Sequence, residues 1–212
     1  VFVFFKIQKF AQTAFFKKLN LMFLILMISE ALLGALLVKG NLVSLNDSIV
    51  RLVVMSFHQL NSFLLSGATF LIYLLFKNEE KNLSISHKNL ILIFLILPIT
   101  GAVASLSTTL FPSTSLFQGI IEDISTRSHL FIRLRVLHPL FASVFCLALI
   151  SYLLFKDKLR LAAELTFVLA IGIATLMTLS PTYLKLFHLF LAHAIWARLI
   201  YVCWNRPDSK SL

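Results

Sequence analysis

The sequence predicts an all-α fold, a polytopic membrane helix bundle with six transmembrane helices, from three observations. The chain of 212 residues is 59% hydrophobic and only 13% charged, and its mean hydropathy of +0.92 is too high for an ordinary soluble domain. Six apolar stretches are each long enough to cross about 30 Å of hydrocarbon at roughly 1.5 Å per residue. The alternating pattern that is typical of a membrane β-barrel is absent from the sequence.

The six predicted helices are joined mostly by short connections, as expected for antiparallel neighbours. They cover residues 19–38, 52–76, 89–110, 130–155, 161–179 and 182–203. Because unpaired backbone groups are costly in lipid, stretches of this length should be α-helical. Basic residues gather near the start of the chain and in the turns at 77–88 and 156–160. The positive-inside rule therefore places both termini in the cytoplasm.

The net charge of +10 does not indicate a nucleic-acid partner. The basic residues are dispersed at helix ends, and no aromatic and basic motif accompanies them. The lipid bilayer is the partner that this composition predicts. Cys146 and Cys203 lie inside predicted helices without CxxC spacing, so we interpret both as packing residues.

The chain begins with apolar residues that lead directly into Lys6 and Lys9. This order is the reverse of a signal peptide, in which the charges come first. We interpret the segment as the last turn of an earlier helix, which predicts an N-terminally truncated sequence. An amphipathic arm on the inner leaflet is the alternative.

The longest connection, residues 111–128, contains Phe117, Ile120, Ile121 and Ile124 at helical spacing. We therefore expect a short helix in this segment. Two interpretations are open, a lid over the outer mouth of the bundle and a connector that simply covers it.

A weak internal repeat is visible in two pairs of helices. Gly34 precedes His58 across one outer turn, and Gly172 precedes His188 across another. Glycines in transmembrane helices usually mark close packing, and the histidines that follow give the pattern weight. The repeat suggests that the first two helices are the second half of a four-helix unit and that the last four form a complete unit.

Histidines inside the membrane are costly and require an explanation. His58, His138 and His188 lie on alternate helices, which run in the same direction, at roughly one to two turns below the outer surface. A bis-histidine heme needs two imidazoles on facing helices at equal depth, and His138 and His188 meet this requirement. Interhelical hydrogen bonds and proton relays are the alternatives. His193 is turned about 140° from His188, so we expect it outside this site.

Other ionisable residues suit the same chemistry. Heme propionates pair well with arginine at a membrane surface, and Arg133 and Arg135 directly precede His138. Both arginines could instead be interfacial anchors. Glu30, in the middle of the first predicted helix, should be protonated or hydrogen-bonded and is a candidate for proton handling.

Five segments resemble those of one known family. They read EALLGALLVKGNLV, HQLNSFLL, GAVASLSTTLFPSTSL, RLRVLHPLFA and LKLFHLFLAHAIW. On these segments, which extend over nearly the whole chain, the sequence is similar to the heme A synthase family of cytochrome oxidase assembly proteins. Members have eight transmembrane helices in two similar halves. They hydroxylate a methyl group of heme O to form heme A.

The resemblance implies the organisation and the site residues. Residues 1–88 would be the second half of the N-terminal four-helix unit, and residues 89–212 the complete C-terminal heme-binding unit. His138 and His188 match the pair that holds a b-type heme, through which electrons would enter. His58 matches a histidine on the side of the substrate, heme O. Heme O synthase or a second copy of the chain are the implied protein partners, in a bacterial plasma membrane.

The chain departs from the family pattern in two ways. It has no counterpart of the first two family helices, which carry the partner histidine of His58, an acidic residue implicated in catalysis, and a cysteine pair in many members. His193 also stands where similar sequences carry an acidic or apolar residue. A non-catalytic electron-transfer protein of the cytochrome b type is therefore the main alternative to a heme A synthase-like oxidoreductase. A transporter-like bundle whose histidines relay protons is the third hypothesis.

Overall fold

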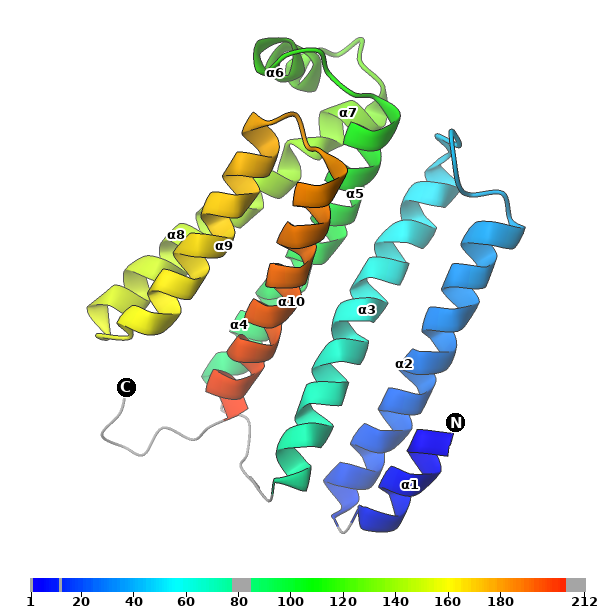
Figure 1. The fold of residues 1–212 in the computed structure, drawn as a ribbon, viewed down its shortest axis with the longest axis vertical. Helices are drawn as coiled ribbons and strands as arrows, with labels where there is room; N and C mark the ends of the chain where they lie inside the picture. The colour runs from blue at the N-terminus through cyan, green and yellow to red at the C-terminus, as the bar shows by residue number, and fades with distance from the viewer. Residues whose placement is uncertain (1, 12, 78–84, 205–212) are drawn as a thin grey trace. The chain divides into compact units, whose positions relative to one another are not determined.

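The computed structural model describes residues 2–11, 13–77 and 85–204, and within these ranges all regular structure is α-helical (Figure 1). The chain forms two compact units. Among the described residues, unit 1 consists of those up to Ile91 and those from Trp196 onward, and unit 2 consists of Leu92–Ile195. The all-α prediction is confirmed, while the division at residue 88 stays a prediction.

Unit 1 is built on two long antiparallel helices, α2 (Ala14–Lys39) and α3 (Ile49–Phe76) (Figure 1). The short helix α1 (Phe2–Phe10) packs beside the beginning of α2. Thr13 and Ser48 begin the long helices, because each hydroxyl accepts a hydrogen bond from an amide of the first turn. Eight buried apolar residues of these three helices and the adjoining turn form one cluster, made of Ile7, Ala11, Phe16, Leu19, Ala68, Ile72, Leu74 and Leu75.

The last part of α10 (Thr182–Trp204) also belongs to unit 1, where it packs against α3. The indole N–H of Trp196 donates a 2.7 Å hydrogen bond to the carbonyl oxygen of Phe63. Gly67, one turn further along α3, leaves room for this ring, since a Cβ there would lie 2.8 Å from Nε1 of Trp196. A buried indole and a glycine therefore fix this contact together.

Unit 2 contains the remaining helices and the first part of α10. They are α5 (Ile96–Leu110), α6 (Leu116–Ile124), α7 (Leu130–Arg135), α8 (Leu137–Phe155) and α9 (Leu159–Met177), with α4 (Ile85–Phe94) before them at the boundary. Figure 1 shows α6 beyond the ends of α5 and α7 and lying across them. We call this end of unit 2 the α6 end.

Two of the predicted spans are interrupted. A single residue, Leu95, separates α4 from α5, and a single residue, Val136, separates α7 from α8. Pro98 and Pro139 each lie three residues after an interruption. A proline has no N–H to donate to the carbonyl four residues earlier, so the regular hydrogen bonding fails at these points. Each pair of short helices still continues in one span.

The prediction of six membrane-spanning helices is confirmed by length and composition. The described chain has six such segments, Ala14–Lys39, Ile49–Phe76, Asn89–Leu110, Leu130–Phe155, Leu159–Met177 and Thr182–Cys203. The fifth begins and ends two residues earlier than the predicted 161–179, and positive φ angles of 60° at Leu179 and 59° at Ser180 follow its end. The protein is therefore a multi-pass membrane protein.

The helix predicted in the long connection is confirmed as α6. Its apolar residues face away from unit 2, with Phe117 74% and Ile124 76% exposed. The polar side of α6, which carries Glu122 and Asp123, faces the protein instead. The contact that positions α6 is therefore electrostatic and not apolar.

Candidate functional site

His138 of α8 and His188 of α10 lie together within unit 2. The centres of their imidazole rings are 6.3 Å apart, and the ring planes differ by 77°. A metal–imidazole bond is about 2.0 Å long and the ring centre lies about 1 Å beyond the nitrogen, so two imidazoles on opposite sides of one metal have centres about 6 Å apart. The separation of this pair fits two axial ligands of one iron.

A glycine of the preceding span lies against each of these imidazoles. A Cβ at Gly101 of α5 would lie 3.2 Å from Cε1 of His138, and a Cβ at Gly172 of α9 would lie 3.0 Å from Cε1 of His188. Both distances are shorter than ordinary carbon contacts of about 3.5–4.0 Å. Each ring therefore occupies space that any side chain at the glycine would fill.

Unit 1 repeats this arrangement once. A Cβ at Gly34 of α2 would lie 3.8 Å from Cε1 of His58 on α3, an ordinary contact distance. The repeat seen in the sequence, of Gly34 with His58 and Gly172 with His188, thus corresponds to real contacts. Gly101 was not among the residues predicted from the sequence, although its place in the helix before His138 is the same signal.

Thr100 fixes the protonation of His138. Its hydroxyl oxygen lies 3.2 Å from Nδ1 of His138 and within 3.2 Å of the carbonyl oxygens of Ile96 and Leu97. Because the hydroxyl hydrogen is donated to a backbone carbonyl, the oxygen accepts a hydrogen bond from Nδ1–H. We therefore assign the proton to Nδ1, which leaves the lone pair of Nε2 for a metal.

His188 is held less firmly than His138. Its Nδ1 is buried and makes no hydrogen bond of ordinary geometry among the described residues, although the backbone of Val168 lies close enough to interact with the ring. No cluster of three or more His, Cys, Asp or Glu side chains that could hold a metal occurs in the described ranges. The histidine pair offers two ligands, the number that a bis-histidine heme takes from its protein.

Glu30 of α2 lies in a polar cluster with residues of α3. Its Oε2 accepts a 2.7 Å hydrogen bond from Nδ2 of Asn61, its Oε1 accepts one from the hydroxyl of Ser62, and Nδ1 of His58 lies 3.5 Å from Oε2. Ser29 donates to the other side of the Asn61 amide at 2.7 Å. Both carboxyl oxygens are thus satisfied, as expected for an acidic residue inside a span.

A groove of about 550 Å³ begins at this cluster and continues along α3. It is lined by Glu30, Ser62, Leu65, Ser66, Thr69, Phe70, Tyr73 and Ala197. The hydroxyl-bearing residues of α3 are spaced by four, three and four positions, so they share one face of the helix. The groove therefore combines apolar walls with a line of hydroxyl groups that starts at a carboxyl.

Arg135 is buried, with 8% of its surface exposed, and it joins α6 to α7. Its Nε lies 2.5 Å from Oδ1 of Asp123, and its Nη2 lies 3.3 Å from Oε2 of Glu122. Its other acceptors are Oγ of Ser113 and the carbonyl oxygens of Phe111 and Gly119. The guanidinium is thus surrounded by acceptors of the protein, a state that the sequence analysis did not foresee.

The two acidic partners of Arg135 differ in their acidity. Hydrogen bonding from Ser113 is the main cause that holds the pKa of Glu122 below its ordinary value, and Gln118 and Arg135 act in the same direction. Burial raises the pKa of Asp123, because it outweighs the attraction of Arg135. Arg133, in contrast, is exposed, and it contacts no carboxylate in the part of the chain that the structure describes.

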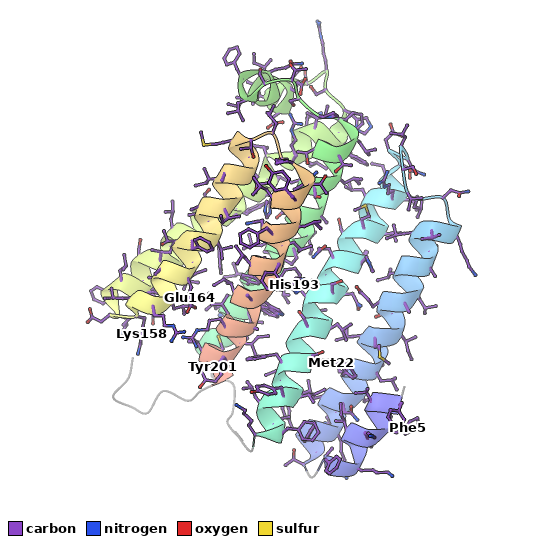
Figure 2. The ribbon with its side chains drawn as sticks, in the orientation of Figure 1. Phe5, Met22, Lys158, Glu164, His193 and Tyr201 are labelled. Carbon is purple, nitrogen blue, oxygen red and sulfur yellow. The ribbon has the colours of Figure 1, made fainter. Side chains whose placement is uncertain are left out.

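The remaining histidine and the cysteines lie apart from the pair. Figure 2 labels His193 on α10, five residues after His188, where it is half-buried. Cys146 and Cys203 are buried and free, in agreement with their interpretation as packing residues.

Comparisons with known proteins agree with the resemblance. Residues 1–200 match the family described as cytochrome oxidase assembly protein. Two proteins from two strains of Thermus thermophilus, each named protoheme IX farnesyltransferase, are 29% identical to this chain over 197 residues. The match covers 84% of this chain and 32% of each relative, so the chain spans about a third of their length. No solved structure matches the chain.

Proposed function

Because this chain belongs to the heme A synthase family of cytochrome oxidase assembly proteins, we propose that it is a membrane oxidoreductase that hydroxylates the methyl group of heme O to form heme A. Its family gives it a heme A synthase-like role in oxidase assembly. The proposal adds the reaction, the b-type heme and the residues that serve them.

In this proposal, His138 and His188 would hold a b-type heme in unit 2. When bound, such a heme supplies one-electron redox chemistry. Thr100 holds the imidazole of His138 through Nδ1, which leaves the lone pair of Nε2 available as a ligand. Gly101 and Gly172 leave the space in which the two rings stand. Arg133 and Arg135 are the propionate partners predicted from the sequence, and of the two only Arg133 is free of carboxylates in the described structure.

We assign the substrate side to unit 1. His58 would face heme O, and Glu30 beside it would handle a proton, because Asn61 and Ser62 hold its carboxyl in a fixed position. The line of hydroxyls in the groove along α3 offers a polar path that ends at this carboxyl. Glu30→Gln should therefore lower heme A formation more strongly than it lowers heme binding.

The observation that carries the proposal is the 6.3 Å separation of the two imidazoles, each lying against a glycine. Heme added to the purified protein should give the shifted and sharpened Soret band of bound heme, and His138→Ala and His188→Ala should each remove most of this bound-heme band. His193→Ala is the matched control on α10 and should keep the band. A band of unchanged position and size in both ligand variants would rule out this site.

The enzymatic step is tested in cells that carry the whole gene. Its deletion should make heme A disappear and heme O accumulate, as measured by chromatography of extracted hemes. Heme A that persists after deletion, with no second synthase gene present, would exclude the enzymatic assignment. The heme site in unit 2 would not be affected by that result.

A non-catalytic electron-transfer protein of the cytochrome b type is the second candidate. The histidine pair lies entirely within unit 2, whereas unit 1 has no second histidine beside His58 among the side chains that the structure describes. A protein with this function would bind heme through His138 and His188 and leave the ratio of heme O to heme A unchanged.

The proposed partners are heme, the lipid bilayer, and either heme O synthase or a second copy of the chain. The name of the two Thermus thermophilus relatives supports a partner in the same pathway, since a farnesyltransferase acts there on protoheme IX. Co-purification of a tagged chain with the farnesyltransferase of the same cell would test heme O synthase as a partner. The mass of the purified chain in detergent would test a second copy of the chain. The proposal also places the chain in a bacterial plasma membrane with both termini in the cytoplasm.

A further inference from the structure

Lys185 lies in the first turn of α10, three residues before His188. This spacing puts it about 4.5 Å nearer to the α6 end and on a neighbouring part of the same helix face. Its Nζ is 3.0 Å from Oγ1 of Thr109 and 3.5 Å from Oγ1 of Thr108, both on α5. The ammonium therefore joins the two helices that carry His188 and Gly101.

The charge of Lys185 has no acidic partner in the part of the chain that is described. Its ammonium contacts two neutral hydroxyls and no carboxylate there. It is partly buried in the first turn of a membrane-spanning segment, and partial burial costs a charge some of its hydration. It also lies at the beginning of a helix, where the helix dipole disfavours a positive charge and favours an anion. A bound anion would relieve both costs.

The charge of Arg135, in contrast, has acidic partners. Like Lys185, Arg135 precedes an axial histidine by three residues, since His138 follows it at that spacing. However, Asp123 and Glu122 already neutralise its charge. Of these two cations, one beside each proposed axial ligand, only Lys185 has its charge available for a ligand.

We propose that Lys185 binds a propionate carboxylate of the heme held by His138 and His188, and that it thereby sets the rotation of that heme. This inference rests on the proposed function of the pair. An ammonium is a compact charge that suits one carboxylate. Thr108 and Thr109 hold the Lys185 side chain in position at the α6 end of the site. Lys185 is thus a positioning residue.

The test compares iron protoporphyrin IX with its dimethyl ester, which lacks the two carboxylates. Both are titrated into the heme-free protein, and the dissociation constants are read from the Soret band. The unmodified chain should bind the acid about tenfold more tightly than the ester, as expected for a charged hydrogen bond. Lys185→Met should lower this ratio severalfold by weakening the binding of the acid alone.

Three matched variants separate Lys185 from other cations. Lys158→Met removes an exposed lysine at the start of α9 and should keep the tenfold ratio. Arg133→Gln and Arg135→Gln test the two arginines, which are the proposed partners of the other propionate. A ratio that persists in Lys185→Met and vanishes in either arginine variant overturns the inference and leaves the heme site intact. Absence of a Soret band with both hemes in the unmodified chain overturns the proposed function itself.

A second measurement needs no heme. Because the ammonium of Lys185 is uncompensated, Lys185→Met should raise the midpoint of thermal unfolding of the heme-free protein. The same variant should gain less stability from added heme than the unmodified chain. If Lys185→Met lowers the midpoint of the heme-free protein, Lys185 stabilises the fold through its contacts with the two threonines. The inference then fails.

Discussion

Gly172 and His188 are in close contact, since a Cβ on the glycine would lie 3.0 Å from Cε1 of the imidazole. Alanine normally stabilises a helix by about 1 kcal/mol relative to glycine. In Gly172→Ala the added methyl group must instead displace the ring. We expect heme affinity to fall by about tenfold, or about 1.4 kcal/mol, in a titration followed by the Soret band.

Gly34→Ala is the matched control for this prediction. The contact of Gly34 with His58 leaves 3.8 Å for a Cβ, so the methyl group fits without displacement. This variant should keep the heme affinity of unit 2 and gain about 0.5–1 kcal/mol of stability from the lower entropy of its unfolded state. Equal effects of the two alanines on heme binding would contradict the role given to Gly172.

Arg135→Gln should release α6 from the rest of unit 2. The change leaves Asp123 and Glu122 without their cation, and breaking a buried ion pair by removal of one partner costs on the order of 3 kcal/mol. Hydrogen exchange should therefore become faster in residues 116–124, and the midpoint of thermal unfolding should fall. The double variant with Asp123→Asn should recover part of the loss, because it removes one of the unpaired charges.

The attachment of α6 should also depend on pH. The pKa of Glu122 lies below its ordinary value of 4.5, so its contribution to stability is present above that value and is lost as the pH falls through the lower value of the folded state. For Asp123 the pKa is raised, so the cost of its buried charge diminishes as the pH falls. Of these two acids, therefore, only Glu122 weakens the attachment of α6 when the pH falls.

Hydrogen exchange of α6, corrected for the intrinsic rate, measures this effect. Protection in the unmodified chain should not be lost through Glu122 between about pH 7 and pH 5, and should fall at lower pH. Glu122→Gln should remove the acid-induced part of the fall. The same acid-induced loss in this variant would show that Glu122 is not responsible.

Composition and periodicity were sufficient for the spans and for α6. Apolar length alone predicts a membrane helix, because backbone groups in lipid have no other way to be satisfied. The interruptions near Pro98 and Pro139 were missed, although both prolines are visible in the sequence. A proline signals a break only where its missing N–H is not compensated by neighbouring groups, and those neighbours depend on packing.

The role of Arg135 shows why the site could be predicted only in part. Its spacing from His138 indicated a propionate partner, and spacing along one helix is all that such an argument uses. Its actual partners, Asp123 and Glu122, come from a helix that folds back from the preceding connection. The one available signal was the acidic pair on the polar side of α6, which required a cation somewhere in the protein.

Gly67→Ala should destabilise the contact of α3 with α10 in unit 1. A Cβ at this position would lie 2.8 Å from Nε1 of Trp196 and 2.9 Å from Cδ1 of Ile200. Such overpacking typically costs about 1–3 kcal/mol, to be measured by thermal unfolding. Adding Trp196→Phe should relieve part of the clash, and a Gly67→Ala variant as stable as the unmodified chain would show that this contact is not tightly packed.

Asn61→Leu should cost less stability in a chain that already carries Glu30→Met than in the unmodified chain. The single change removes the 2.7 Å hydrogen bond to Oε2 of Glu30 and leaves that oxygen short of a donor, at a cost of about 1–3 kcal/mol. The double variant replaces both partners by apolar groups, so its cost should fall short of the sum of the single costs by about 0.5–3 kcal/mol. Denaturation in detergent measures all four free energies of unfolding. Thr166→Val, which removes a hydrogen bond from the Thr166 hydroxyl to the carbonyl oxygen of Ala162 within α9, should be additive with Glu30→Met. Equal additivity for Asn61→Leu would mean that the carboxyl and the amide do not interact.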